Sequence, residues 1–201
     1  MFDLSEELAS IRDEFAARGL EFAVCGGIAM AIHGFTRATE DLDLFVRPEE
    51  VEAIEAALEG LGYAIKSAPA TVGAMNIRRV SKIDAAEDDN LAVDLLLVSP
   101  ETSAVWNSRE VVSWRDQPLP VVSREGLIAL KRLRATSMDL VDIGRMETEG
   151  DDTSRPISLC IGRVAQLRNF CLSLGKAGRA ARKKGQLSPL TPATSKVSSN
   201  R

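Results

Sequence analysis

Residues 41–46 read Asp-Leu-Asp-Leu-Phe-Val, so acidic and apolar side chains alternate before the segment becomes fully apolar. Successive side chains of a β-strand point to opposite faces, which predicts a strand with Asp41 and Asp43 on one face and the leucines on the other. Carboxylates about 5–7 Å apart repel each other unless a cation lies between them or one takes up a proton. The segment therefore favours a divalent-metal site on a β-sheet.

A third carboxylate and a glycine pair extend this pattern. Asp94 lies inside the otherwise apolar run 91–98, which predicts a buried strand, and a buried carboxylate needs a partner. Gly26 and Gly27 end the strand predicted over 21–25 and precede a helix over 28–32. Such a pair can bring backbone N–H groups close to a phosphate, although glycine pairs are also common in tight turns.

The remaining periodicities predict alternating helices and strands, and hence an α/β domain. The segment 81–90, which is rich in acidic residues, is expected to be a solvated turn between two of the strands. Helices are expected over 5–18, 28–32, 48–61, 100–106, 124–135, 138–146 and 153–175; strands are expected over 21–25, 42–46, 63–66, 74–80, 91–98, 111–114 and 119–122.

Composition indicates one globular domain. The chain has 201 residues, 45% of them hydrophobic, and no apolar run approaches the roughly 20 residues that span a bilayer. The N-terminal residues are acidic where a signal peptide is basic, so no secretion is expected. The cysteines, Cys25, Cys160 and Cys171, are odd in number and form no CxxC pair, which predicts buried thiols in a protein of the cytoplasm.

The C-terminal part divides at a change of composition. An apolar stripe at helical spacing predicts an amphipathic helix within 148–175 that packs on the domain formed by 1–147. Residues 176–201 contain seven basic and no acidic side chains among Ser, Thr, Pro, Gly and Ala, which predicts a disordered tail. Such a basic tail could also attract RNA phosphates.

The pattern Cys25-Gly26-Gly27, thirteen further residues, Asp41-Leu42-Asp43 and a later Asp94 resembles the nucleotidyltransferase superfamily with the DNA polymerase β-like fold. The segments 125–131 and 138–143, which contain Lys131 and an Asp-x-x-Asp pair, are similar to those of the abortive-infection (AbiEii-type) nucleotidyltransferase toxins. The resemblance covers residues 20–147 and implies a small mixed β-sheet flanked by helices, an α+β arrangement with C-terminal helices.

The resemblance also implies a site and a reaction. Asp41, Asp43 and Asp94 would hold Mg²⁺ or Mn²⁺, and a nucleoside triphosphate would lie over Gly26 and Gly27. Metal ions bridging the carboxylates and phosphates would support in-line attack of an acceptor hydroxyl on the α-phosphorus. Arg37 and Thr39 are expected to bind the nucleotide, and Lys131 is expected to take part in catalysis at the triphosphate. Ordinary surface or loop roles remain open for all three residues.

The acceptor is not defined by these residues. An RNA end such as that of tRNA, in a toxin, is slightly favoured, while a small molecule or a protein hydroxyl remains open. A non-catalytic nucleotide-binding module, such as one component of a toxin-antitoxin pair with an antitoxin partner, is the second hypothesis. In a third, the carboxylates simply pair with Arg37 and Lys131. No membrane partner is expected.

Overall fold

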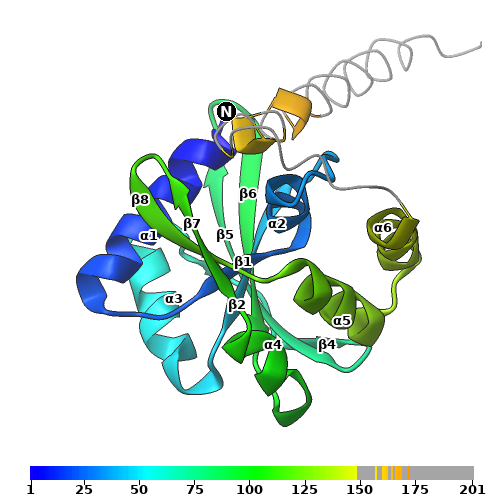
Figure 1. Cartoon of the computed structure of the whole chain (residues 1–201). Coiled ribbons are helices and arrows are strands. Elements are labelled where there is room, and N and C mark those ends of the chain that lie inside the picture. The colour runs from blue at the N-terminus through cyan, green and yellow to red at the C-terminus, as the bar shows by residue number, and fades with distance from the viewer. Residues whose placement is uncertain (149–156, 158–159, 163, 165, 169–171, 173–201) are drawn as a thin grey trace, which may run out of the picture.

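The computed structural model describes residues 1–148, 157, 160–162, 164, 166–168 and 172 (Figure 1). Its helices are α1 (Leu4–Arg18), α2 (Gly26–Ile32), α3 (Val51–Gly60), α4 (Ser103–Asn107), α5 (Arg124–Arg134) and α6 (Ser137–Thr148), with short 3₁₀ turns η1 (Pro48–Glu50) and η2 (Pro100–Thr102). Its strands are β1 (Ala23–Cys25), β2 (Asp41–Val46), β3 (Ile65–Lys66), β4 (Ala70–Val72), β5 (Met75–Asp84), β6 (Asp89–Leu97), β7 (Glu110–Trp114) and β8 (Gln117–Val121).

The eight strands form one mixed sheet in the order β3-β5-β6-β2-β1-β8-β7, with β4 paired to β5. The central strands β2 and β6 are parallel, whereas β1 and β2 are antiparallel and so are β5 and β6. This arrangement confirms the predicted α/β fold with a small mixed sheet flanked by helices. Strand β2 lies between β1, which precedes it in the chain, and β6, which follows it.

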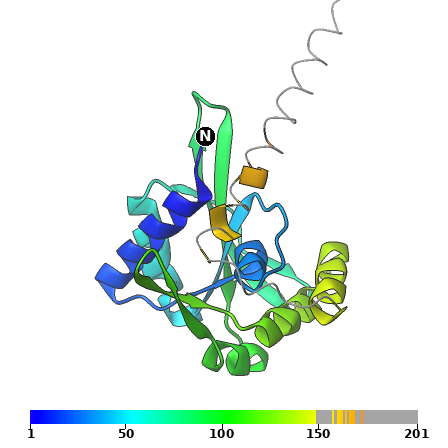
Figure 2. The same cartoon turned by 45° about the horizontal axis from the view of Figure 1, so that its top comes forward.

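Helices cover the two sides of the sheet. Figures 1 and 2 show α1 and α3 on one side and α2 and α5 on the other, with α6 outside α5. On β2, Leu42, Leu44 and Val46 are fully buried, as expected for the face opposite the aspartates. Phe45 lies on the same face as the aspartates and packs edge-on against Trp106 of α4, with ring centroids 5.8 Å apart. Apolar packing on both faces therefore fixes β2 in place.

Two sequence-based predictions for the β5–β6 region are wrong. The predicted solvated turn over 81–90 is shorter, because β5 continues to Asp84 and β6 begins at Asp89. Asp89, which was expected in this solvated turn, is buried. Its carboxylate accepts hydrogen bonds from the Phe2 backbone N–H at 2.7 Å and from Arg168 at 3.1 Å. Strand β4, which pairs with the start of β5, was not predicted at all.

The described residues between 157 and 172 are helical, and one of them anchors this helix to the sheet. The buried Arg168 pairs with Asp89 and donates to the carbonyl groups of Phe2, Glu40 and Asn90. Ile161 and Val164 are buried as predicted, but Leu167 is 38% exposed, so the predicted apolar stripe is interrupted. Cys171 and the predicted tail over 176–201 lie outside the described residues.

The division of the chain at 147 and 175 stays a prediction.

Within the part of the chain that the structure describes, no helix is long and apolar enough to cross a membrane. Cys25 and Cys160 are buried, as predicted.

Candidate active site

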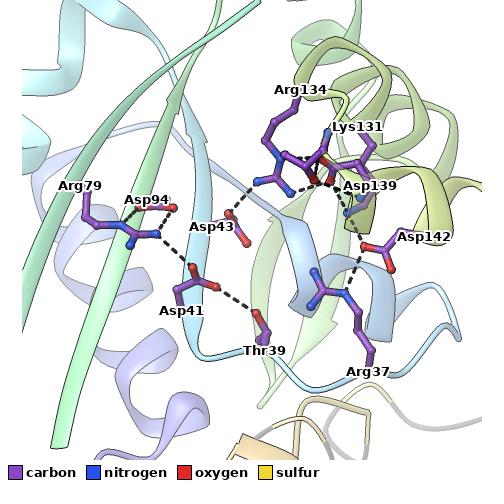
Figure 3. A network of polar contacts seen from close by, with 11 residues as sticks. Arg37, Thr39, Asp41, Asp43, Arg79, Asp94, Lys131, Arg134, Asp139 and Asp142 are labelled. Carbon is purple, nitrogen blue, oxygen red and sulfur yellow. Dashed lines mark hydrogen bonds and ion pairs between the residues drawn. The ribbon is translucent and has the colours of Figure 1, made fainter. Parts of the chain in front are cut away.

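The structure brings the three predicted carboxylates to one face of the sheet (Figure 3). Parallel pairing of β2 with β6 sets Asp43 directly opposite Asp94. Asp41 precedes Asp43 by two residues and therefore lies on the same face of the sheet. The side chains of Asp43 and Asp94 are only 7% and 8% exposed, whereas that of Asp41 is 32% exposed. One carboxylate is thus open to solvent, and two lie deeper against the sheet.

Gly26 allows the chain to pass next to Asp43. Antiparallel pairing sets Cys25 opposite Asp43, and Gly26 then turns with a φ of +61°, which favours glycine. A Cβ at Gly26 would lie 1.8 Å from Asp43 Oδ2, and a Cβ at Gly27 would lie 2.8 Å from the Thr39 Cβ. Both glycines are therefore required by the close packing of site residues, whatever further role their N–H groups have toward a phosphate.

Asp41 is held by two neighbours. Thr39, which is buried, donates from its hydroxyl to Asp41 Oδ1 at 3.0 Å. Arg79 donates from Nη2 to Asp41 Oδ2 at 3.3 Å. The structure therefore places Thr39 as a residue that orients Asp41, in addition to any contact with a nucleotide.

Arg79 did not stand out in the sequence, yet it forms the shortest contacts around the carboxylates. It lies opposite Asp94 in the β5–β6 pair and donates Nε to Oδ1 at 2.5 Å and Nη2 to Oδ2 at 2.6 Å. Its guanidinium thereby bridges Asp94 and Asp41 (Figure 3). Among the described residues, no three acidic, histidine or cysteine side chains are arranged together to hold a metal ion.

A second network, contributed mainly by α5 and α6, lies on the other side of Asp43. Lys131 donates from Nζ to Asp142 at 2.7 Å and to Asp139 at 3.3 Å, and Arg37 donates to the same oxygen of Asp142 at 3.2 Å. Lys131, Asp139 and Asp142 are almost completely buried, so Lys131 is not a solvated surface lysine. The Asp-x-x-Asp pair, Asp139 and Asp142, therefore holds the Lys131 ammonium in place.

Arg134 links this network to the carboxylates and was also missed. It donates Nε and Nη2 to the two oxygens of Asp139, at 2.9 and 2.7 Å, while Nη1 lies 3.8 Å from Asp43 Oδ1. Arg134 lies three residues after Lys131, and residues at this spacing share one face of a helix. Helical spacing from Lys131 could therefore have identified it.

The surroundings shift the pKa values of the acidic groups in opposite directions. Burial, with a further contribution from repulsion by Asp41, raises the pKa of Asp43 to about 7, although Arg134 partly offsets the effect. Burial alone would also raise the pKa of Asp139, but hydrogen bonds from Arg134 and Thr136 hold this pKa well below its usual range. Asp43 is therefore the site carboxylate that is short of positive charge.

Two open cavities lie on either side of Asp41, which lines both of them. The first, of about 340 Å³, is lined by Arg37, Ala38, Thr39, Glu40, Asp41, Asp43 and Arg134. The second, of about 750 Å³, extends along β5 and β6 to the C-terminal helix and is lined by Glu40, Asp41, Arg79, Ser81, Ile83, Ala85, Asp88, Asp89, Asn90, Ala92, Arg168 and Leu172. Glu40 and Asp41 line both cavities.

The mixed sheet thus carries three carboxylates on adjacent strands beside a glycine turn, the arrangement that the sequence resemblance to nucleotidyltransferases led us to expect. The family described as "Nucleotidyl transferase AbiEii toxin, Type IV TA system" matches residues 11–156, so the chain belongs to this family of enzymes. The family match confirms the resemblance found in the sequence. None of the curated proteins matches the chain.

Several solved structures are similar at low sequence identity. A putative nucleotidyltransferase from Thermotoga maritima (TM1012) is 14% identical, with a TM-score of 0.47 over 71% of this chain and 88% of that chain. The lincosamide antibiotic adenylyltransferase LnuA, lincomycin-bound, is 15% identical, with a TM-score of 0.46 over 71% and 96%. ANT(2")-Ia in complex with adenylyl-2"-tobramycin is 20% identical, with a TM-score of 0.45 over 90% and 97%.

Proposed function

We propose that this protein transfers a nucleoside monophosphate from a nucleoside triphosphate to a hydroxyl acceptor in a reaction that depends on Mg²⁺ or Mn²⁺. The observation that carries the proposal is the placement of Asp41, Asp43 and Asp94 on one sheet face, between a cationic network and a large open cavity. Nucleotidyl transfer needs these three features together: oxygen ligands for a metal, positive charge for the phosphates and space for an acceptor.

The carboxylates suit a hard divalent cation. Their oxygens are the ligands that Mg²⁺ and Mn²⁺ prefer. Burial and repulsion by Asp41 raise the pKa of Asp43, and a cation at Asp41 and Asp43 would stabilise its charged form. When bound there, with Asp94 completing the ligand set, the cation would neutralise charge on the phosphates and activate the acceptor hydroxyl.

The nucleotide is proposed to occupy the 340 Å³ cavity. Arg37 and Arg134 line it, and guanidinium groups match phosphate oxygens in geometry and charge. Thr39 holds Asp41 in place, and the N–H groups of Gly26 and Gly27 are further candidate donors to the phosphates.

Lys131 is proposed to support catalysis from its buried position. It neutralises Asp139 and Asp142, which in turn hold Arg134 and Arg37. Loss of Lys131 is therefore expected to disturb both arginines at the nucleotide cavity.

The acceptor is proposed to enter through the 750 Å³ cavity. In-line displacement requires the attacking hydroxyl and the leaving pyrophosphate to lie on opposite sides of the α-phosphorus. If Arg37 and Arg134 hold the triphosphate on one side of Asp41, the acceptor must approach from the other side. The larger cavity opens on that side and shares Glu40 and Asp41 with the nucleotide cavity.

An RNA end such as that of tRNA is the first candidate acceptor, with the protein acting as a toxin that an antitoxin partner would counteract. The family to which the chain belongs, named for toxins of toxin-antitoxin systems, supports the toxin role. We place the protein in the cytoplasm, which is consistent with the buried free thiol of Cys25.

A cationic small molecule with hydroxyl groups is the second candidate, and a specific observation favours it. Among the described residues that line the larger cavity, Arg168 pairs with Asp89, and Arg79 pairs with Asp94 and Asp41. Glu40 and Asp88, which also line it, are both exposed. This acidic excess would attract a cationic acceptor and repel a phosphate backbone.

The test is label transfer from each α-³²P nucleoside triphosphate in the presence of Mg²⁺. Total RNA, the protein itself and a panel of aminoglycosides serve as acceptors, and Asp43→Asn serves as the inactive control. Labelled RNA, labelled protein and labelled small molecule each identify one acceptor class. Nucleotide binding without transfer would instead support a non-catalytic module, and absence of both would leave the carboxylates a structural role.

A further inference from the structure

Arg79 makes short contacts with two of the three site carboxylates. Both oxygens of Asp94 accept from its guanidinium within 2.6 Å, and Asp41 accepts from Nη2 at 3.3 Å. Bidentate, charge-assisted pairs of this kind are the strong class of protein hydrogen bond. An arginine also stays protonated at every working pH, so this positive charge is permanent.

The position of Arg79 conflicts with a metal ion at the same two carboxylates. Its guanidinium lies between Asp94 and Asp41, where a bridging cation would also need to contact their oxygens. Two positive groups cannot both occupy this space without repulsion. The side chain of Arg79 is, however, 46% exposed and lines the 750 Å³ cavity, so it has open space into which it can move.

We infer that the guanidinium of Arg79 serves as the counter-cation of Asp41 and Asp94 when no metal is bound. A divalent ion must displace this guanidinium before it can bind the two carboxylates. This inference rests on the proposed metal-dependent function. It explains how two acidic side chains, one of them buried, can lie side by side without a metal. Competition from Arg79 also makes the metal affinity of the nucleotide-free protein lower than the affinity of three carboxylates without a competing cation.

Arg78 provides a matched control. It is the neighbouring residue on β5, and its side chain leaves the opposite face of the strand to pair with Glu55 at 2.8–2.9 Å. Arg78→Gln therefore removes the same charge and a comparable ion pair from the same strand without touching the site carboxylates.

The experiment is a Mn²⁺ titration of the full chain, followed by electron paramagnetic resonance of the free ion, at pH 8 and without nucleotide. We expect Arg79→Gln to bind Mn²⁺ roughly tenfold more tightly than the wild type, the order set by one charge-assisted contact. Arg78→Gln should bind like the wild type. Arg79→Lys, which keeps the charge but loses the bidentate fork, should fall between the two, and it replaces Arg79→Gln if that variant is unfolded.

An unchanged or weakened affinity in Arg79→Gln, or equal gains in Arg79→Gln and Arg78→Gln, would overturn the inference. A gain that persists in Arg79→Gln/Asp94→Asn would do so as well, because the released ligand would then not be Asp94. These outcomes are independent of catalysis. Failure of label transfer with the expected Mn²⁺ affinities would overturn the proposed function alone, whereas absence of Mn²⁺ binding in every variant would overturn both.

Discussion

Asp43 and Asp94 lie directly opposite each other on the adjacent parallel strands β2 and β6, although they are far apart in the chain. Both carboxylates are largely buried, but their partners differ. Asp94 has the guanidinium of Arg79 within hydrogen-bonding distance, whereas Arg134 comes only to 3.8 Å of Asp43. The pair is therefore electrostatically unequal, and this inequality leads to the first two predictions.

Asp43→Asn should lower nucleotidyl transfer by roughly a hundredfold or more, because it removes a proposed metal ligand from the centre of the site. It should not lower the melting temperature of the metal-free protein, since the carboxylate it replaces is buried and short of positive charge. Measured transfer rates test the expected loss of activity, and thermal unfolding tests the expected melting temperature. Asp13→Asn, on helix α1, is the control and should keep wild-type transfer; wild-type transfer by Asp43→Asn would remove Asp43 from the catalytic site.

The contribution of Asp43 to the stability of the metal-free protein should fall as the pH rises from about 4 to about 7. The pKa of Asp43 is raised from 3.8 to about 7, so in this window the folded protein keeps a proton that the unfolded chain has released. Each rise in pH then favours the unfolded state. Denaturant titrations at several pH values measure the effect as the difference between the wild type and Asp43→Asn, in which this contribution is absent. A difference that is constant from pH 4 to 8 would contradict the prediction.

Divalent-metal affinity should change with pH in the opposite sense, because only the ionised Asp43 can bind the cation. Below about pH 7, each unit of acidification should weaken Mn²⁺ binding by up to about tenfold, and the affinity should level off above this pH. Titrations of the wild type between pH 5.5 and 8.5 give the profile, and Asp43→Asn should lack the step near 7.

The sequence predicted the carboxylate face because local patterns determine it. Alternation over 41–46 places Asp41 and Asp43 together, and a lone acid in the apolar run 91–98 marks Asp94 as a buried residue that needs a partner. The family pattern then located the glycine turn and Lys131. None of these inferences required knowledge of which strands are neighbours.

Arg79 could not be found in the same way, because its role depends on hairpin register. Had the turn spanned 81–90 as predicted, residues 80 and 91 would pair and Arg79 would lie opposite Ala92. The shorter turn shifts the pairing by two residues and sets Arg79 opposite Asp94. Asp89 and Arg168 were missed for a related reason, since their pairing depends on how the C-terminal helix meets the sheet.

Gly26→Ala should destabilise the protein and abolish transfer. A Cβ at this position would overlap Asp43 Oδ2 at 1.8 Å, and the backbone φ of +61° is also unfavourable for alanine. Gly19→Ala separates the two causes, because Gly19 has a φ of +66° with no atom within 4 Å of its added Cβ. Gly19→Ala should cost about 1 kcal/mol from backbone strain alone, and Gly26→Ala clearly more. Equal costs in denaturant unfolding would show that the approach of Asp43 to the turn is not tight.

Lys131→Met should destabilise the protein by about 3–5 kcal/mol, because it leaves two buried carboxylates without their shared cation. Asp139 and Asp142 both accept from Lys131 Nζ, and neither is open to solvent. Arg132→Met is the control on the same helix: its ion pair with Glu147 is exposed, so its removal should change the free energy of unfolding by less than about 1 kcal/mol. In Lys131→Met/Asp142→Asn, which also removes the buried negative charge of Asp142, part of the stability should return. A Lys131→Met variant as stable as Arg132→Met would mean that the buried network does not hold Arg37 and Arg134 at the nucleotide cavity.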